Sequence, residues 1–261
     1  MSVKPYKGFE PKWIKEPAPK DSYRSIFRWG DPDFVKYPKE SLYKMKKDVF
    51  KMTDEDFSHY EGDTGFEKVV LDKPSLMEEK HIEAFRKIVG ADNVSTADYD
   101  RLSVAYGKTG YDALRLRERR IDSLPDVVLY PSDKEEIKAI VDYCVANKIP
   151  LYVYGGGSSV TMGVEPVKGG VSLDMRRNFN KVIAFNEIDQ TITVQAGMSG
   201  PKLEETLNDA VKLFNAKRAY TCGHFPQSFE YSSVGGWVVT RGAGQNSTYY
   251  GKIEDIVLSQ E

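Results

Sequence analysis

The spacing of apolar residues divides the chain into an irregular beginning and a regularly patterned remainder. Residues 1–40 hold prolines, lysines and aromatic residues without a clear period, which predicts an irregular arm. Helical spacing follows in residues 38–52 and again in residues 75–90, where Gly90 marks the expected end of the helix. The basic run at residues 113–125 is predicted to be the solvated face of a further helix.

From Asp126 onward, short apolar runs typical of strands alternate with amphipathic helices. Strands are predicted in residues 127–130, 150–154 and 169–175, and residues 180–197 have the pattern of a β-hairpin. Helices are predicted in residues 133–147, opened by a capping box from Ser132 to Glu135, and in residues 199–214. Cys144 falls on the apolar stripe of the first of these helices, so its predicted role is packing. This order of elements predicts an α+β fold.

Composition narrows the class of protein only slightly. The 261 residues are 40% hydrophobic and 29% charged, which is enough for one large domain or two modest lobes. The net charge of -2 gives no support for nucleic-acid binding. Two cysteines and three widely spaced histidines indicate neither a disulfide framework nor a metal site. No apolar run is long enough for a membrane span, and the first residues lack the apolar core of a secretory signal, so the cytoplasm is the expected location.

Three consecutive glycines and two serines follow the predicted strand at residues 150–154, in the run LYVYGGGSSVTMG. The run lacks the Gly-Lys-Ser/Thr end of a mononucleotide loop, and Val160 stands where a dinucleotide fingerprint has its third glycine. Glycines let the backbone approach a ligand closely, and the amides of such a turn, together with Ser158 and Ser159, would bind an anion. Pyrophosphate is the expected guest, and a tight loop that only reverses the chain is the alternative.

A second segment rich in glycine, serine and threonine covers residues 222–257, CGHFPQSFEYSSVGGWVVTRGAGQNSTYYGKIEDIV. One such segment is common in proteins of any function. Two of them, separated by about one small subdomain, indicate two walls of a site for one long ligand.

Several motifs, in the same order along the chain, resemble a known family. YVYGGGSSVTMG, SLDMRRNFN, GHFPQSFEYSSVGGWVVTRGAG and YGKIEDIV resemble the flavin-binding (PCMH-type) domain of the vanillyl-alcohol-oxidase superfamily. Within it, the chain is most similar to the alkyldihydroxyacetonephosphate synthase subfamily, which residues 101–137 and the arm motif RWGDPDF also resemble. The resemblance implies an α+β FAD-binding domain of two α/β subdomains over residues 101–261, preceded by an N-terminal arm and helical region over residues 1–100.

The resemblance implies FAD as the cofactor, with its pyrophosphate on the first glycine loop and its flavin along the second segment. Some relatives attach FAD through a histidine in the first loop, but Ser158 stands at that place, so a non-covalent cofactor is expected. His224 is expected to be a buried, hydrogen-bonded structural residue, and Trp237 is expected to pack in the core. The implied cofactor-binding residues are Val153, Tyr154, Gly155, Gly156, Gly157, Ser158, Ser159, Val160, Pro226, Gln227, Ser228, Ser232, Ser233, Gly235, Gly236, Thr240, Arg241, Gly242 and Ala243.

The family pattern continues past Glu261 with a cap domain and the residues that carry out the chemistry. The chain is therefore expected to be an incomplete part of the domain, inactive alone, and either a fragment or completed by a second polypeptide or a homodimer. The implied activity is the flavin-dependent exchange of an acyl for an alkyl chain on glycerone phosphate. A D-lactate or glycolate dehydrogenase or oxidase, and a non-catalytic FAD-binding subunit, stay open as alternatives. The expected ligand is a small molecule or lipid phosphate, and peripheral membrane contact is left open.

Overall fold

The computed structural model describes residues 18–26, 40–58 and 65–261, so the arm motif RWGDPDF and most of the predicted arm lie outside the described residues. A mixed sheet organises the middle of the chain. Its strands are β1 (Val94–Ser95), β2 (Val127–Leu129), β3 (Leu151–Tyr154) and β4 (Val171–Asp174), in the spatial order β1-β2-β4-β3. Strands β2, β4 and β3 run parallel, with Leu129 and Val153 both in register with Leu173, and β1 is antiparallel. The carboxyl ends of the three parallel strands therefore meet at one edge of the sheet.

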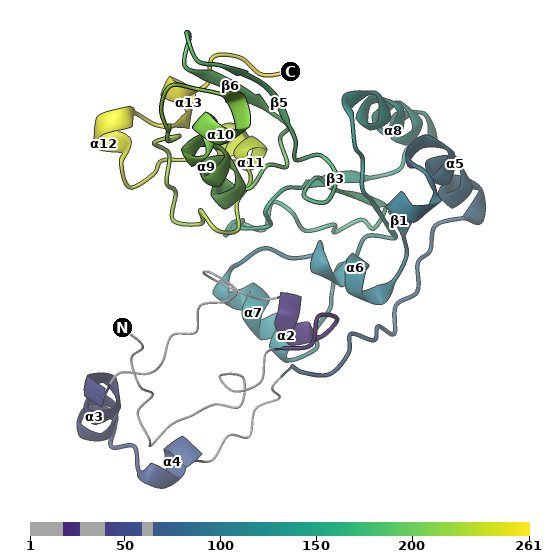
Figure 1. Ribbon diagram of the computed structural model, residues 1–261. Helices are drawn as coiled ribbons and strands as arrows, with labels where there is room; N and C mark the ends of the chain where they lie inside the picture. Colours follow the sequence, from purple (N-terminus) through teal and green to yellow (C-terminus); the bar gives the residue numbers. More distant parts are fainter. Residues whose placement is uncertain (1–17, 27–39, 59–64) are drawn as a thin grey trace.

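Two helices pack against this sheet and form the main core with it. Helix α5 (Glu79–Val89) ends at Gly90 as predicted, and its apolar side joins α8 (Lys134–Asn147). Figure 1 shows α5 and α8 side by side. The core residues are Phe85, Val89, Val127, Leu129, Ile140, Cys144, Val171, Leu173 and Met175, so the packing role predicted for Cys144 is confirmed.

The start of α8 differs from the predicted capping box. Asp133, and not Ser132, caps the helix, because the Asp133 carboxylate accepts a hydrogen bond from the Glu136 amide at 2.8 Å. The reciprocal contact also shifts by one residue, since the Ser132 amide donates to the Glu136 carboxylate at 2.7 Å. Three polar residues in a row make the register of such a box ambiguous in sequence.

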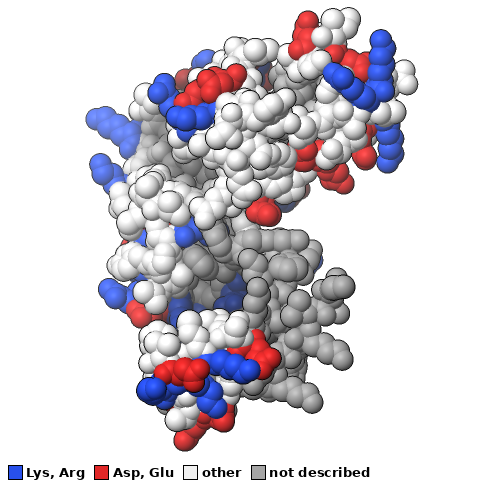
Figure 2. Space-filling model, turned by 90° about the vertical axis from the view of Figure 1, so that its left-hand side faces the viewer, with Lys and Arg blue, Asp and Glu red and all other residues white. Residues whose placement is uncertain are grey.

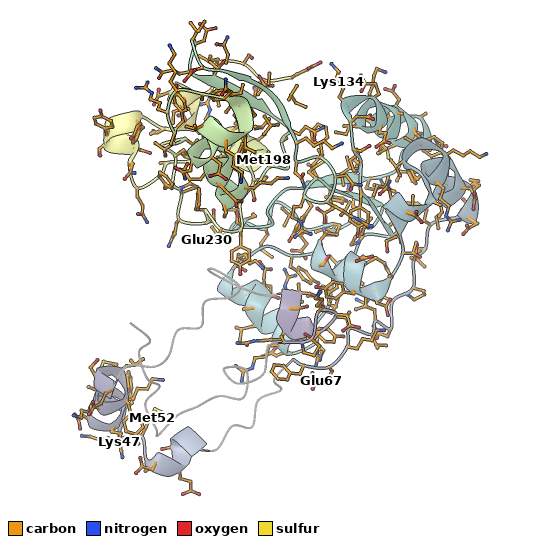
Figure 3. All side chains as sticks on the ribbon, viewed as in Figure 1. Lys47, Met52, Glu67, Lys134, Met198 and Glu230 are labelled. Atoms are coloured by element: carbon orange, nitrogen blue, oxygen red, sulfur yellow. The ribbon has the colours of Figure 1, made fainter. Side chains whose placement is uncertain are left out.

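A second unit follows the sheet. The predicted hairpin is confirmed as β5 (Val182–Asn186) and β6 (Thr191–Val194), which pair antiparallel. The helix predicted over residues 199–214 is instead two helices, α9 (Gly200–Asn208) and α10 (Ala210–Phe214), and α11 (Val234–Thr240), α12 (Ser247–Tyr250) and α13 (Ile253–Ile256) complete the unit. Trp237 and the fully buried Met198, labelled in Figure 3, lie in its core, so the packing predicted for Trp237 is confirmed.

The remaining helices of the first half of the chain lie below the sheet in Figure 1, on the side away from α5 and α8. They are α2 (Tyr23–Ile26), α3 (Glu40–Phe50), α4 (Asp54–Ser58), α6 (Asp98–Ser103) and α7 (Gly110–Arg117), with a short 3-10 turn, η1 (Ala91–Asn93), before β1. No helix among the described residues is both long and apolar enough to cross a membrane.

The solvated helix face predicted for residues 113–125 is wrong at Arg115, and the helix itself, α7, ends at Arg117. The Arg115 side chain is only 3% exposed, and its guanidinium pairs with Asp112 at 2.6 Å and with Glu165 at 2.8 Å. It also lies 4.1 Å from the centroid of the Tyr106 ring. Two carboxylates from separate parts of the chain thus allow this arginine to be buried, and Glu165 ties the loop after β3 to α7.

Candidate functional site

The first glycine loop, residues 155–160, follows β3 directly and packs against the second Gly/Ser segment, residues 226–243. A Cβ atom on Gly156 would overlap the carbonyl oxygen of Tyr231, and one on Gly155 would collide with the Ser233 hydroxyl. Gly157 has a positive φ of 68°, and a Cβ atom there would overlap the Tyr154 hydroxyl. The absence of side chains thus lets two backbones approach each other closely. The two segments predicted to be walls of one site are in direct contact.

A segment upstream of the sheet, residues 106–108, supports the same loop from another side. The Lys108 amide donates to the Ser159 carbonyl at 2.7 Å, and a Cβ on Gly107 would overlap that carbonyl. The buried Tyr154 hydroxyl lies 3.4 Å from the Tyr106 carbonyl. The conformation of the glycine loop is therefore set by contacts to protein on two sides.

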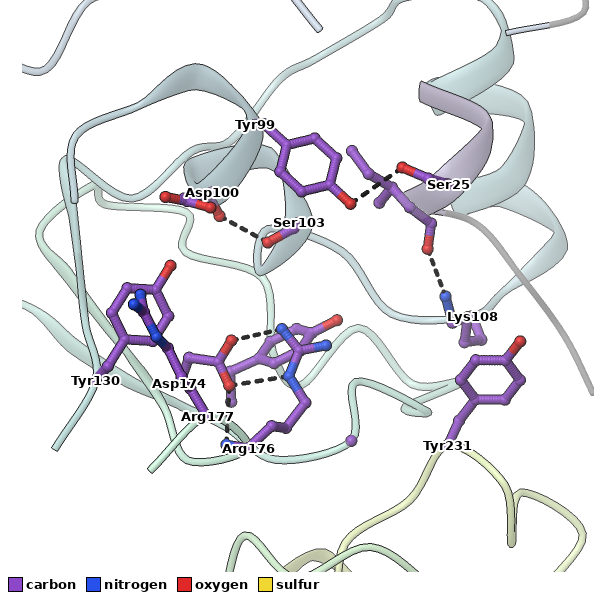
Figure 4. Close-up of a pocket in the computed structure, with 13 residues that line it drawn as sticks. Ser25, Tyr99, Asp100, Ser103, Lys108, Tyr130, Asp174, Arg176, Arg177 and Tyr231 are labelled. Carbon is purple, nitrogen blue, oxygen red and sulfur yellow. Dashed lines mark hydrogen bonds and ion pairs between the residues drawn. The ribbon is translucent and has the colours of Figure 1, made fainter. Parts of the chain in front are cut away.

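A cavity of about 420 Å³ opens beside this loop, at the carboxyl edge of the parallel strands. Figure 4 shows residues from the ends of β2, β3 and β4 around it, together with side chains of α2 and α6. Ligands of open α/β sheets bind at this edge, and the volume lies in the usual range for small-molecule sites. The cavity is lined by Ser25, Ile26, Tyr99, Asp100, Ser103, Lys108, Tyr130, Tyr154, Gly156, Asp174, Arg176, Arg177 and Tyr231.

Cations and aromatic rings dominate the polar chemistry of the cavity. Arg176 donates to both carboxylate oxygens of Asp174, from Nε at 2.9 Å and from Nη2 at 2.5 Å, so this pair is internally neutralised. Arg177 stacks on the Tyr130 ring at 4.6 Å. Burial and, less strongly, the charge of Arg176 together lower the pKa of Lys108 to about 8, while the charge of Asp112 acts in the opposite direction. Away from the cavity, Figure 2 shows acidic and basic side chains intermingled over the face in view.

Only two of the predicted cofactor-binding residues, Tyr154 and Gly156, line the cavity. Several hydroxyl groups among the predicted residues form hydrogen bonds within the protein. The Ser232 hydroxyl accepts from the Trp237 indole at 2.6 Å and donates to the Ser228 carbonyl at 2.7 Å. Ser233 caps α11, and the Thr240 hydroxyl donates to the Gly236 carbonyl. The predicted residues that do not line the cavity are Val153, Gly155, Gly157, Ser158, Ser159, Val160, Pro226, Gln227, Ser228, Ser232, Ser233, Gly235, Gly236, Thr240, Arg241, Gly242 and Ala243.

His224 is buried as predicted, with 1% of its surface exposed and its ring against Trp237 at 5.0 Å. The expected hydrogen bond is not found among the described residues, since neither ring nitrogen has a partner there. Burial lowers the pKa of this imidazole, so the neutral form is favoured.

The cations of the cavity were missed by sequence reasoning. Lys108 lies upstream of the patterned region, and Arg176 and Arg177 sit in the motif SLDMRRNFN without a role assigned to them. A usable signal was present, because both arginines directly follow the predicted strand at residues 169–175. Side chains just past the end of a parallel strand face the ligand edge of the sheet.

Residues 125–261 match the protein family described as FAD binding domain, and the chain belongs to this family. Its cofactor is accordingly FAD. The chain is 30% identical over 229 residues to alkyldihydroxyacetonephosphate synthase of Trypanosoma brucei brucei, which covers 85% of this chain and 36% of that relative. The Caenorhabditis elegans synthase is 36% identical over 162 residues, 60% of this chain and 26% of that relative.

Other comparisons agree with this assignment and broaden it. A solved structure of alkyldihydroxyacetonephosphate synthase superposes with a TM-score of 0.67 at 30% identity, covering 73% of this chain and 34% of that one. D-lactate dehydrogenase [cytochrome] 1, mitochondrial, of Saccharomyces cerevisiae is 26% identical and covers 72% of this chain and 31% of its own length. The chain thus spans about a third of the length of the curated relatives it matches.

Proposed function

We propose that this chain contributes the cofactor site of a flavoenzyme of the alkyldihydroxyacetonephosphate synthase type, which exchanges an acyl for an alkyl chain on glycerone phosphate. The observation that carries the proposal is the cavity beside the glycine loop, at the carboxyl edge of the parallel strands. The identities of 30% and 36% to two synthases support it.

The residues around the cavity fit FAD, which is both doubly charged at its pyrophosphate and aromatic at both ends. The loop amides near Gly156 would hold the pyrophosphate, and Lys108 and Arg177 would neutralise its charge. The rings of Tyr130 and Tyr154 would exclude water around it. When bound, FAD supplies an electrophilic ring that accepts electrons, which no side chain of the protein can replace.

We further propose that FAD is held without a covalent bond, because Ser158 stands where some relatives carry a linking histidine. Acid precipitation of the flavin-loaded protein tests this directly. The yellow colour should pass into the supernatant, and colour that stays with the pellet contradicts the proposal.

The catalytic groups are proposed to lie in the two thirds of the relatives that this chain does not span, so the 261 residues alone should bind FAD weakly and show little turnover. Losing a few hydrogen bonds of about 1 kcal/mol each weakens binding by one to several orders of magnitude. Fluorescence titration of FAD measures this, and a submicromolar dissociation constant would argue against it. A second polypeptide or a homodimer that completes the site belongs to the same proposal.

The similarity to D-lactate dehydrogenase favours a second candidate, oxidation of a 2-hydroxy acid. The two candidates differ in electron balance, because the acyl-for-alkyl exchange is redox-neutral overall whereas hydroxy-acid oxidation needs an electron acceptor. Dye reduction with D-lactate, measured on the protein together with whatever chain completes it, would support the second candidate. Exchange activity without dye reduction would support the first.

A further inference from the structure

Arg177 is held in place by its surroundings but is not neutralised by them. Its guanidinium lies 4.6 Å from the centroid of the Tyr130 ring and lines the cavity. Within residues 18–26, 40–58 and 65–261 it forms no ion pair and no side-chain hydrogen bond. The neighbouring Arg176 differs, because its Nε and Nη2 groups both donate hydrogen bonds to the Asp174 carboxylate. Arg177 therefore keeps its N–H edge available for a further partner.

Tyr130 gives this arginine a fixed platform. The residue is only 5% exposed, and its amide donates to the Asn93 carbonyl at 3.0 Å. The Asn178 side-chain amide donates to the Tyr130 carbonyl and to the Asn93 side-chain oxygen, both at 2.9 Å. Because Asn178 is the next residue after Arg177, these bonds tie the ring and the chain that carries the guanidinium to one point. The stacked pair is thus preorganised before any ligand arrives.

The chemistry of a stacked guanidinium specifies the class of partner. Stacking uses the flat face of the group and leaves its fork of donors free, and this fork matches the paired oxygens of a phosphate or a carboxylate. The acidic residues of the cavity already have partners, since Asp174 binds Arg176 and Asp100 accepts the Ser95 hydroxyl at 2.5 Å. An incoming anion would therefore meet a cation whose charge is not yet matched.

The location of Arg177 in the cavity also favours an anion site. In Figure 4, Arg177 and Tyr130 lie across the cavity from Lys108 and Tyr231. The glycine loop approaches the cavity at Gly156, so an anion at Arg177 would lie in the same cavity as the loop. A ligand with separated negative charges, or two ligands side by side, would suit this arrangement.

We propose that Arg177, stacked on Tyr130, binds a phosphate or carboxylate group in the cavity. The inference rests on the proposed function, because this group belongs either to the pyrophosphate of FAD or to an anionic substrate held beside it.

Inorganic phosphate and pyrophosphate provide a test that does not depend on FAD. Each is titrated into the ¹⁵N-labelled chain while the Nε–Hε resonance of Arg177, assigned by its loss in Arg177→Gln, is followed by NMR. Calorimetry gives the affinities. We expect a saturable shift of this resonance, and we expect Arg177→Gln to weaken binding of one or both anions about tenfold or more. Arg177→Lys keeps the charge but not the fork, so it should restore only part of the affinity.

Arg218→Gln is the matched control. Arg218 also stacks on a tyrosine, Tyr220, at 5.3 Å, but it does not line the cavity, so its removal should leave anion binding unchanged. Melting temperatures of all variants show whether a loss of binding reflects unfolding, and Arg177→Lys keeps the test valid if Arg177→Gln is unstable.

A parallel FAD titration distinguishes the two sources of the anion. A matching loss of FAD affinity in Arg177→Gln assigns the site to the cofactor, and unchanged FAD affinity with lost phosphate binding assigns it to a substrate. Phosphate binding at Arg177 in a protein that takes up no FAD would leave this inference standing while the proposed function fails. The inference is overturned if neither anion shifts the Arg177 resonance, or if folded Arg177→Gln binds both anions as tightly as the wild type.

Discussion

Replacing Gly156 with alanine should damage the fold and the cofactor site together. The added Cβ would overlap the Tyr231 carbonyl oxygen and lie 2.5 Å from its carbonyl carbon. The backbone of Gly156 has no positive φ, so the penalty comes from this collision and not from an unfavourable backbone conformation. Both partners are main-chain groups, which cannot rotate away as a flexible side chain would.

The size of the effect follows from the displacement that is needed. An ordinary contact requires the loop and the second segment to separate by about 1 Å, and overpacking of this kind costs about 1–3 kcal/mol. For a chain of this length each kcal/mol lowers the melting temperature by about 2–4 °C, so a fall of roughly 2–12 °C is expected. Gly163→Ala is the control within the same stretch, because its Cβ would meet nothing closer than the Ser159 hydroxyl at 3.8 Å. That change should be neutral or stabilise by about 0.4–1 kcal/mol.

Circular dichroism melts measure the stability of both variants, and flavin titration measures FAD affinity per folded molecule. We expect Gly156→Ala to lose both and Gly163→Ala to keep both. Melting of Gly156→Ala at the wild-type temperature would refute the reasoning, because it would mean that the two backbones are not in the close contact described.

Three further predictions concern ionisable residues. Anion binding in the cavity should weaken as the pH rises through about 8, where Lys108 loses its charge, and Lys108→Arg should remove this dependence in titrations at pH 6.5 and 9.5. Glu165→Gln should cost about 1–3 kcal/mol in urea unfolding, because it leaves buried Arg115 with Asp112 as its main counter-charge, and an unchanged unfolding midpoint would contradict this. Burial lowers the pKa of His224 in the fold, whereas the unfolded chain takes up a proton below about pH 6.5. The free energy of unfolding of His224→Phe, relative to that of the wild type, should therefore be higher at pH 5 than at pH 8. An equal difference between variant and wild type at the two pH values would contradict this.

Much of the fold could be predicted because its strands are continuous apolar runs. The predicted strands at residues 127–130, 150–154 and 169–175 correspond to β2, β3 and β4, of which β2 and β4 are buried and β3, at the edge of the sheet, is only partly buried. Strand β1 has only two residues and no alternating pattern, so its place at the sheet edge depends on pairing with β2 and not on its own sequence. The break between α9 and α10 at Asp209 is likewise invisible to helical periodicity, since the apolar spacing runs through it.

The sequence predicted a ligand site at the first glycine loop, beside which the cavity lies, but it did not indicate most of the side chains that line this cavity. Three glycines after a buried strand indicate a close backbone approach, and sequence alone cannot tell whether the approaching group is a ligand or another part of the chain. At Gly156 it is the backbone at Tyr231. Basic residues pose the opposite problem, because burial and exposure depend on partners distant in sequence. Arg115 was predicted to lie in solvent, but it is buried and paired with Glu165. No role was predicted for Arg176 and Arg177, which line the cavity.

The glycine loop and Arg177 are expected to contribute differently to anion binding at the cavity, and experiments can distinguish the two contributions. The glycine loop is held by contacts to residues 106–108 and to the second segment, so substitutions that disturb those contacts change stability and affinity together. Arg177 lies over the Tyr130 ring, lines the cavity and is exposed, so its replacement should change affinity with little change in stability. Rigid backbone amides position an anion but add little net charge, whereas Arg177, held against the Tyr130 ring, adds that charge. Under the proposed function, the loop would position a doubly charged group and Arg177 would supply the positive charge, and both Gly156 and Arg177 line the one cavity.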